Sequence, residues 1–225
     1  MGGYGSPVLL SGQRTGQHQQ IHSEQSRKNG LNAEEINKHD MKLYTQDTTQ
    51  TQQPPVKELF FIISPPRHII SDVSVLKDDV HYLVGHEMED RYSKANIALF
   101  KYSDTEKHIN HIVRFVEARA AEIEPFNIFL KDFGVFFNGS FRTIYMDIVN
   151  KSPIQEVFEK IVKEDPEYIP HITIARNLAI NDFLRCWPYL KGLRYSNQHF
   201  LCDRITVLAR SEKKWMHYKD IVFGG

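Results

Sequence analysis

The predicted secondary structure of this chain repeats. From Lys57 the hydrophobic pattern predicts a strand, a helix, a short strand, a second helix and paired strands, and the same order starts again at Phe141. Aligning the two copies places residues 96–99 opposite residues 171–174. This internal duplication constrains the fold more than any single motif, because each copy is expected to build a similar unit of structure.

The first copy opens with a short apolar run. Leu59–Ile63 is apolar at every position and is stopped by Ser64-Pro65-Pro66, which predicts a buried strand followed by a turn. Apolar residues at helical spacing then predict a helix that ends at Gly85. The rest of this copy is expected to contain a strand at 95–100, a helix that starts at a capping box of Ser103 and Glu106 and ends before Pro125, one or two strands within 126–137, and a hairpin turn at Asn138-Gly139.

The second copy follows the same plan. It is expected to contain a strand at 141–149, a helix from Ser152-Pro153 to Val162, the strand that holds His171, a helix from about 180 to 192, and strands at 200–209 and 215–223. We therefore expect one domain over residues 57–225, with a first lobe at about 57–138 and a second lobe at about 139–225.

Residues 1–56 differ in composition from the rest of the chain. They are rich in Gln, Thr, Ser and Asn, contain no sustained apolar period, and end in Gln52-Gln53-Pro54-Pro55. Such a segment buries too little apolar surface to offset the entropy of ordering, so we predict a disordered polar tail. A short helix over Ala33–Leu43, capped by Asn32, is the alternative for part of it.

Composition and charge exclude several classes of function. Lys+Arg and Asp+Glu are equal at 28 each, so the chain has no global positive field, and a contact with nucleic acid must be a local patch. Cys186 and Cys202 stand outside any CxxC arrangement and are interpreted as reduced packing residues. No apolar run approaches transmembrane length, and the start lacks the layout of a secretory signal. We therefore expect a cytoplasmic protein without a membrane contact.

One predicted strand carries the most chemistry. In Tyr168-Ile169-Pro170-His171-Ile172-Thr173-Ile174-Ala175-Arg176, side chains alternate between the two faces of a sheet. His171 and Thr173 therefore share one face, while Ile172 and Ile174 point into a core. A histidine that titrates near neutral pH and a hydroxyl two residues on can move a proton and bind a phosphate oxygen from one rigid surface.

The motif and its setting resemble a known superfamily. Pro170-His171-Ile172-Thr173-Ile174-Ala175-Arg176 is similar to the second His-x-Thr motif of the 2H phosphoesterases, in their 2'-5' RNA ligase and cyclic phosphodiesterase-like branch. The segments 141–146 and 59–66 resemble the strands that open the two lobes of that family. The resemblance covers residues from about 57 to the C-terminus. It implies an α+β fold of two lobes, with antiparallel sheets around a central cleft and helices outside.

The same resemblance implies a function. One histidine of the family acts as general base, the other as general acid, and the two hydroxyls hold the phosphate, without a metal or cofactor. Carried over to this chain, His171 and Thr173 are the candidate catalytic residues, and Asn96, Arg176 and Arg142 are candidates for substrate binding. The implied partner is an RNA end or a small phosphodiester nucleotide, bound by a monomer.

The first motif departs from the family pattern. Asn96 and Ala98 stand where the second copy has His171 and Thr173. An amide forms hydrogen bonds but exchanges no proton near neutral pH, and a methyl group offers nothing to phosphate. A positioned general acid or base contributes about 10²–10⁴ in rate, so we predict weakened turnover and retained binding.

Other residues offer alternatives to this site. His108 and His111 lie one helical turn apart, a spacing that suits a metal pair, but no third ligand accompanies them and a solvated helix face is the favoured interpretation. His199 is a candidate replacement for the missing histidine. Tyr168, Tyr145 and Trp215 are candidates for base stacking or for core packing.

Two functions therefore stay open. The first is a phosphoesterase or RNA-end enzyme that acts on 2',3'-cyclic or 2'-5' phosphodiesters through His171. The second is a catalytically silent protein that binds a nucleotide or RNA end at the same place.

Overall fold

The structure is a computed structural model and describes residues 56–162 and 165–225 of the chain. The predicted polar tail and its alternative helix at Ala33–Leu43 lie outside these residues, except for Val56. The described elements are, in chain order, β1 (Val56–Ile63), α1 (Arg67–Val84), β2 (Ile97–Thr105), α2 (Glu106–Ala120), β3 (Phe126–Asn138), β4 (Phe141–Ile148), α3 (Ser152–Ile161), β5 (Ile172–Ala179), α4 (Ile180–Gly192), β6 (His199–Cys202), β7 (Arg204–Ser211) and β8 (Lys214–Val222).

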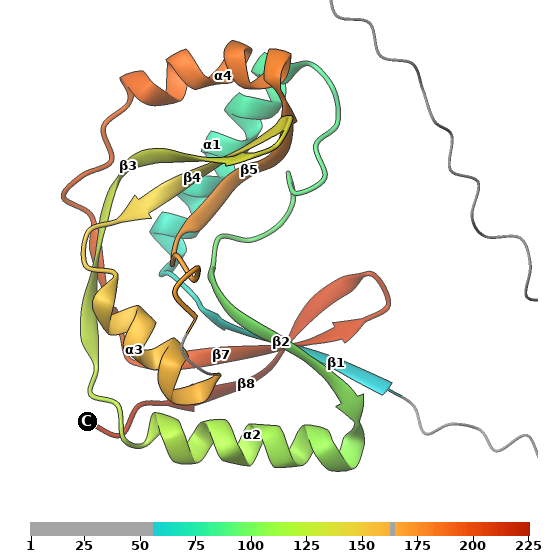
Figure 1. Ribbon diagram of the computed structural model, residues 1–225, viewed down its shortest axis with the longest axis vertical. Coiled ribbons are helices and arrows are strands. Elements are labelled where there is room, and N and C mark those ends of the chain that lie inside the picture. The colour runs from blue at the N-terminus through green and yellow to red at the C-terminus, as the bar shows by residue number, and fades with distance from the viewer. Residues whose placement is uncertain (1–55, 163–164) are drawn as a thin grey trace, which may run out of the picture. The chain divides into compact units, whose positions relative to one another are not determined.

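The eight strands form one sheet, in the order β6-β3-β4-β5-β2-β1-β7-β8. Every strand pair in it is antiparallel. The predicted α+β class with antiparallel strands and covering helices is therefore confirmed. β2 and β5, the strands of the two aligned motifs, are neighbours at the centre of the sheet (Figure 1).

The two copies exchange elements within the sheet. β3 of the first copy pairs with β4 and β6 of the second, and β7 and β8 of the second copy extend the sheet beyond β1. The helices exchange as well, since α1 packs on α4 and β5, while α2 packs on α3, β1 and β8. Each half of the sheet is therefore built from both halves of the sequence, which places the two motif strands at the junction between the copies.

The core lies between the helices and one face of the sheet. On β1, Leu59, Phe61 and Ile63 have exposed fractions of 0%, 0% and 1%, and on the central strands Ile97 and Ile172 are fully buried. Each helix presents one apolar face to these residues, as the sequence period predicts. The residues between them in each strand point to the other face of the sheet. We call this second face, which carries His171 and Thr173, the motif face.

Two predicted boundaries are wrong. Ser103 lies inside β2 and not at a helix cap, because β2 continues along β1 until Thr105 opposes Val56. The strand predicted at 200–209 is two strands, because Cys202 pairs with β3 whereas Arg204 pairs with β8 on the other side of the sheet. Within the described ranges, no helix combines the length and the apolar character needed to cross a bilayer.

Candidate functional site

The two aligned motifs meet at one residue pair. Ile97 of β2 opposes Ile172 of β5, and both side chains are fully buried on the core face. The neighbours of this pair therefore lie on the motif face: Asn96 immediately before β2 and Ala98 within it, and His171 immediately before β5 and Thr173 within it. The structure thus brings together the residues that the repeat aligned, although they are far apart in the sequence.

The ring of His171 is held in one orientation. Its Nδ1 lies 2.7 Å from the carbonyl oxygen of Ile169, and because a carbonyl only accepts, Nδ1 carries the proton. The ring edges meet Phe136 and Tyr145, with centroid distances of 5.0 and 5.3 Å. Nε2 is then the atom that carries the lone pair of the neutral ring, which is the arrangement of a general base.

The surroundings of His171 favour its neutral form. Burial lowers the pKa of the imidazole, and the positive charges of Arg176 and Lys151 act in the same direction. The bond to Ile169 and the carboxylate of Asp147 oppose this shift, but burial outweighs them. Asp147 is itself paired with Lys151 at 2.8 Å. His171 is therefore suited to accept a proton at neutral pH rather than to donate one.

Thr173 lies beside the rings of Phe136 and Tyr145, which we call the aromatic wall. It opposes Tyr145 of β4 in the sheet, and the Tyr145 ring stacks on Phe136 of β3 at a centroid distance of 4.1 Å. Phe136 and Asp147 were not among the residues selected from the sequence. Asp147 follows Tyr145 by two residues in a predicted strand, so the alternation of faces already pointed to it.

The first motif offers no proton chemistry. The side-chain amide of Asn96 donates to the carbonyl oxygen of Lys94 at 2.9 Å, which commits one donor to the local backbone. The Tyr168 hydroxyl donates to the carbonyl oxygen of Ala98 at 3.0 Å, and its ring stacks on Phe158 at 3.9 Å. Tyr168 is therefore a packing residue beside the first motif, and its ring face toward Phe158 is not open to a base.

The two candidate arginines lie in different places. Arg176 is on the strand of His171, with its Nε 3.4 Å from Oδ2 of Asp90, and its side chain remains half exposed. Arg142 lies at the β3–β4 hairpin, where it donates to the carbonyl oxygens of Gly139 and Phe141 and covers the Phe137 ring. Arg176 is thus near the motif, whereas the guanidinium of Arg142 is bonded to the hairpin backbone at the end of β4 away from His171.

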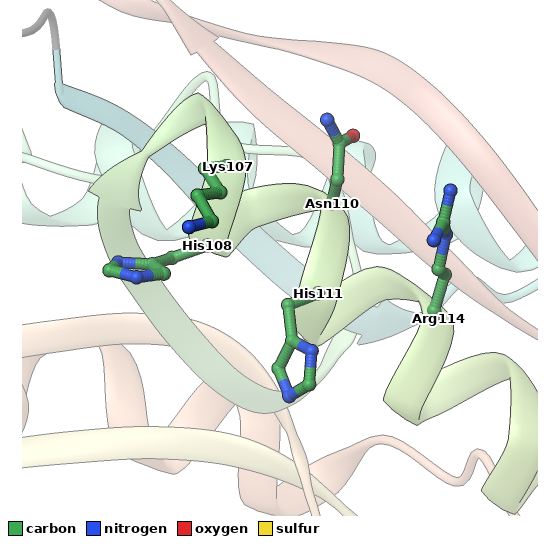
Figure 2. A pocket seen from close by; sticks show the side chains of 5 residues that line it. All are labelled: Lys107, His108, Asn110, His111 and Arg114. Atoms are coloured by element: carbon green, nitrogen blue, oxygen red, sulfur yellow. The ribbon is translucent and has the colours of Figure 1, made fainter.

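The remaining histidines do not complete the site. Figure 2 shows His108 and His111 on α2 with Lys107, Asn110 and Arg114. These five residues line an open hollow of about 370 Å³. Nδ1 of His108 lies 2.9 Å from the Asp104 carboxylate, and the described residues contain no group of three or more metal ligands. His199 begins β6 at the edge of the sheet, with β3 and β4 between it and β5. Neither position supplies the histidine that Asn96 replaces.

Gly134 makes room for the aromatic wall. A Cβ at this position would lie 2.4 Å from Cζ of Tyr145, which opposes Gly134 across β3 and β4. The Tyr145 ring therefore lies across the β3 backbone because residue 134 has no side chain, and this position brings the ring against His171.

Gly134→Ala is expected to displace the Tyr145 ring. The overlap should reduce the free energy of unfolding by about 1–3 kcal/mol, as for other overpacked sites. With less burial, the lowered pKa of His171 should move up toward its ordinary value, and a proton NMR titration of the ring would measure this shift. Gly192→Ala is the matched control, because nothing lies within 4 Å of its added Cβ. An unchanged His171 titration in Gly134→Ala would contradict the role of Tyr145.

The fold and the His-x-Thr strand define a 2H phosphoesterase-like protein. The family model of the 2'-5' RNA ligase superfamily matches residues 93–214, which is more than half of the 225 residues, and the chain belongs to this superfamily. No curated protein is similar to the chain in sequence.

Solved structures support the same fold. The protein TT0787 of Thermus thermophilus superposes with a TM-score of 0.52 at 15% identity, over 75% of this chain and 98% of that protein. LigT of E. coli, solved in complex with NADP+, gives a TM-score of 0.51 at 12% identity, over 77% of this chain and 100% of LigT. At these identities the likeness is one of fold.

Proposed function

We propose that this protein binds and slowly turns over phosphodiesters of RNA ends, such as 2',3'-cyclic or 2'-5' linked nucleotides, on the motif face. His171 transfers the proton, Thr173 holds a phosphate oxygen, and Asn96 and Arg176 contribute to binding. The observation that carries the proposal is the bond from Nδ1 of His171 to Ile169, which leaves Nε2 as a base beside Thr173. The complex of LigT with NADP+, a phosphorylated dinucleotide, supports the ligand class.

A second function is favoured by the first motif. Asn96 is bonded to the backbone of Lys94, and Ala98 has no hydroxyl, so this half of the site lacks an acid and the hydroxyl that would hold a phosphate oxygen. A binding protein without turnover fits these residues as well as a weakened enzyme does. Both functions are compatible with the expected monomeric, cytoplasmic protein.

Turnover separates the two functions. We expect the purified full chain to cleave a 2',3'-cyclic nucleotide or a 2'-5' dinucleotide slowly, and His171→Ala to reduce that rate by about 10²–10⁴. If binding is measurable while His171→Ala leaves a residual rate unchanged, the protein is a binder and the rate comes from elsewhere.

The pH dependence of binding should report on His171. A 2',3'-cyclic nucleotide keeps a single negative charge over the neutral range, so changes in its affinity come from the protein. Because burial lowers the pKa of His171, the ring becomes cationic only below the ordinary histidine value of about 6.5. Affinity should therefore rise as the pH falls below this value and stay flat above it. Isothermal titration calorimetry from about pH 5 to about pH 8, a range that brackets the ordinary histidine value, would measure the change. If the double variant His171→Ala, Thr173→Ala shows the same dependence of affinity on pH, the ligand binds elsewhere on the protein.

A further inference from the structure

A second surface on the sheet combines aromatic rings with positive charges. Trp215 of β8 packs on Phe60 of β1 with a centroid distance of 5.3 Å, and both side chains are half-buried. The Lys101 ammonium lies 5.3 Å from the Phe60 ring and 5.4 Å from the Trp215 ring. The Arg210 guanidinium lies 5.2 Å from the Trp215 ring. We call these four residues the tryptophan platform.

The tryptophan platform lies on the motif face. Phe60 stands between Leu59 and Phe61, which are fully buried on the core face, so its side chain points the other way. Across the sheet Phe60 opposes Lys101 of β2, and Trp215 opposes Arg210 in the β7–β8 hairpin, drawn in red in Figure 1. The platform and the His171 motif therefore share one surface, connected through β2.

The charges of the platform are available to a ligand. Within the described ranges, neither Lys101 nor Arg210 forms an ion pair with an acidic side chain, and both are exposed. Arg210 uses Nε for the carbonyl oxygen of Glu212, which leaves its terminal nitrogens free. The hairpin tip adds exposed Lys213 and Lys214 beside the single carboxylate of Glu212. The chain has no net charge, so this local excess is not a consequence of overall composition.

We infer that the tryptophan platform binds a base and the adjoining phosphates of single-stranded RNA whose end occupies the His171 site. The inference rests on the function proposed above and extends it from an RNA end to a longer strand. Aromatic rings flanked by cations suit single strands, because every unpaired base exposes a face for stacking and the backbone carries the phosphates. A duplex hides its base faces, and the Asp and Glu side chains of an acidic peptide have no ring to stack on Trp215.

The spacing sets the length of the ligand. β8 follows β5 by four strand steps, through β2, β1 and β7. Neighbouring strands lie about 4.8 Å apart, so Trp215 is on the order of 20 Å across the sheet from His171. A mononucleotide reaches only one of the two places, whereas a strand of about six nucleotides spans both.

The two tryptophans of the chain allow a direct test by fluorescence. Trp187→Phe leaves Trp215 as the remaining tryptophan, and Trp187 lies on α4, stacked on Phe183, away from the platform. Hexauridylate should quench the fluorescence of Trp215 in this variant, whereas uridine 2',3'-cyclic phosphate should not. Equal quenching by poly-glutamate would make the platform a protein-binding surface and overturn the inference.

The affinities for hexauridylate and for the cyclic mononucleotide should respond differently to changes in the platform. Trp215→Ala is expected to weaken hexauridylate binding by about 5- to 150-fold, the range for loss of one base stack, and to leave binding of the cyclic mononucleotide unchanged. Trp215→Phe keeps a ring and should recover most of the affinity, and matching melting temperatures would exclude unfolding.

Lys101→Ala should flatten the slope of log affinity against log salt by about 0.7. Arg114→Ala, which removes one positive charge from the hollow on α2, is the matched control and should leave the slope unchanged.

The outcome separates this inference from the proposed function. His171→Ala, Thr173→Ala should abolish mononucleotide binding but leave the quenching of Trp215 by hexauridylate. If Trp215→Ala binds hexauridylate as tightly as the unmodified chain, the platform does not bind RNA, whatever the result at His171.

Discussion

Asn96→His combined with Ala98→Thr is expected to raise the turnover of a 2',3'-cyclic nucleotide by up to about 10²–10⁴. Ile97 is fully buried and opposes Ile172, so both new side chains enter on the motif face beside His171 and Thr173. The neutral His171 is suited to act as the base, and the new histidine would supply the missing acid. The substitution removes the bond from Asn96 to Lys94, which should cost about 0.5–1.5 kcal/mol of stability.

Two controls make this gain specific. Adding His171→Ala to the double variant should return the rate to its starting value, because both histidines are needed. Ser103→His places an imidazole on β2 toward its other end and should not raise the rate. A displacement of the new ring by about 1 Å would cost about 10²-fold, so even a tenfold gain supports the interpretation. A rapid wild-type enzyme that the double variant does not improve would show that another residue has replaced the lost histidine.

Lys77→Met is expected to cause the largest loss of stability. Lys77 is 1% exposed, and its ammonium donates to the carbonyl oxygen of Asp90 at 2.9 Å and to Oγ of Ser93 at 2.7 Å. Burial lowers the pKa of this amine, and the nearby Asp90 charge partly opposes the effect. Removing the ammonium leaves the buried carbonyl oxygen of Asp90 and Oγ of Ser93 without this charged donor, and it removes a positive charge near the Asp90 carboxylate, which is paired with Arg176. Each hydrogen bond to a charged group contributes about 1.5–3 kcal/mol, so the two together predict a loss of about 3–5 kcal/mol.

Denaturant unfolding would measure this loss. Lys107→Met is the matched control, because Lys107 is exposed on α2 and its replacement should change the free energy of unfolding by less than about 0.5 kcal/mol. Ser93 and Asp90 belong to the loop that leads into Asn96, so amide exchange in this loop should also become faster in Lys77→Met. A variant as stable as the wild type would show that the loop is held by its other contacts.

The sequence was sufficient for the parts of the site that depend on alternation. The strand period predicts that His171 and Thr173 share one face and that Ile172 lies in the core, and the repeat aligns Asn96 with His171, without information on tertiary contacts. These predictions succeeded because a strand has only two faces, and an apolar residue between two polar ones decides which face is buried.

The hydrogen-bond partners of individual polar side chains were not predictable in the same way. Arg142 matched a family strand in sequence, yet its guanidinium is used by the carbonyl oxygens of the hairpin beside it. Lys77 occupies a core position of an amphipathic helix, where a charged residue is not expected. Its burial was not predictable because its hydrogen-bond partners, Asp90 and Ser93, come from a loop that has no periodic pattern. Local pattern reports which face is buried but not which groups meet there.

The sequence by itself determined the element order, the duplication, the apolar face of each strand and helix, and the presence of Asn96 and Ala98 where the second copy has His171 and Thr173. These features follow from residue types and from periods of a few residues. Only the tertiary structure decided that β3 pairs with strands of the second copy and β7 with β1 of the first, that the Tyr145 ring packs over Gly134 and against His171, and that Trp215 packs on Phe60. Pairing between strands far apart in the chain is selected by the packing of the whole core, and no short segment contains that information.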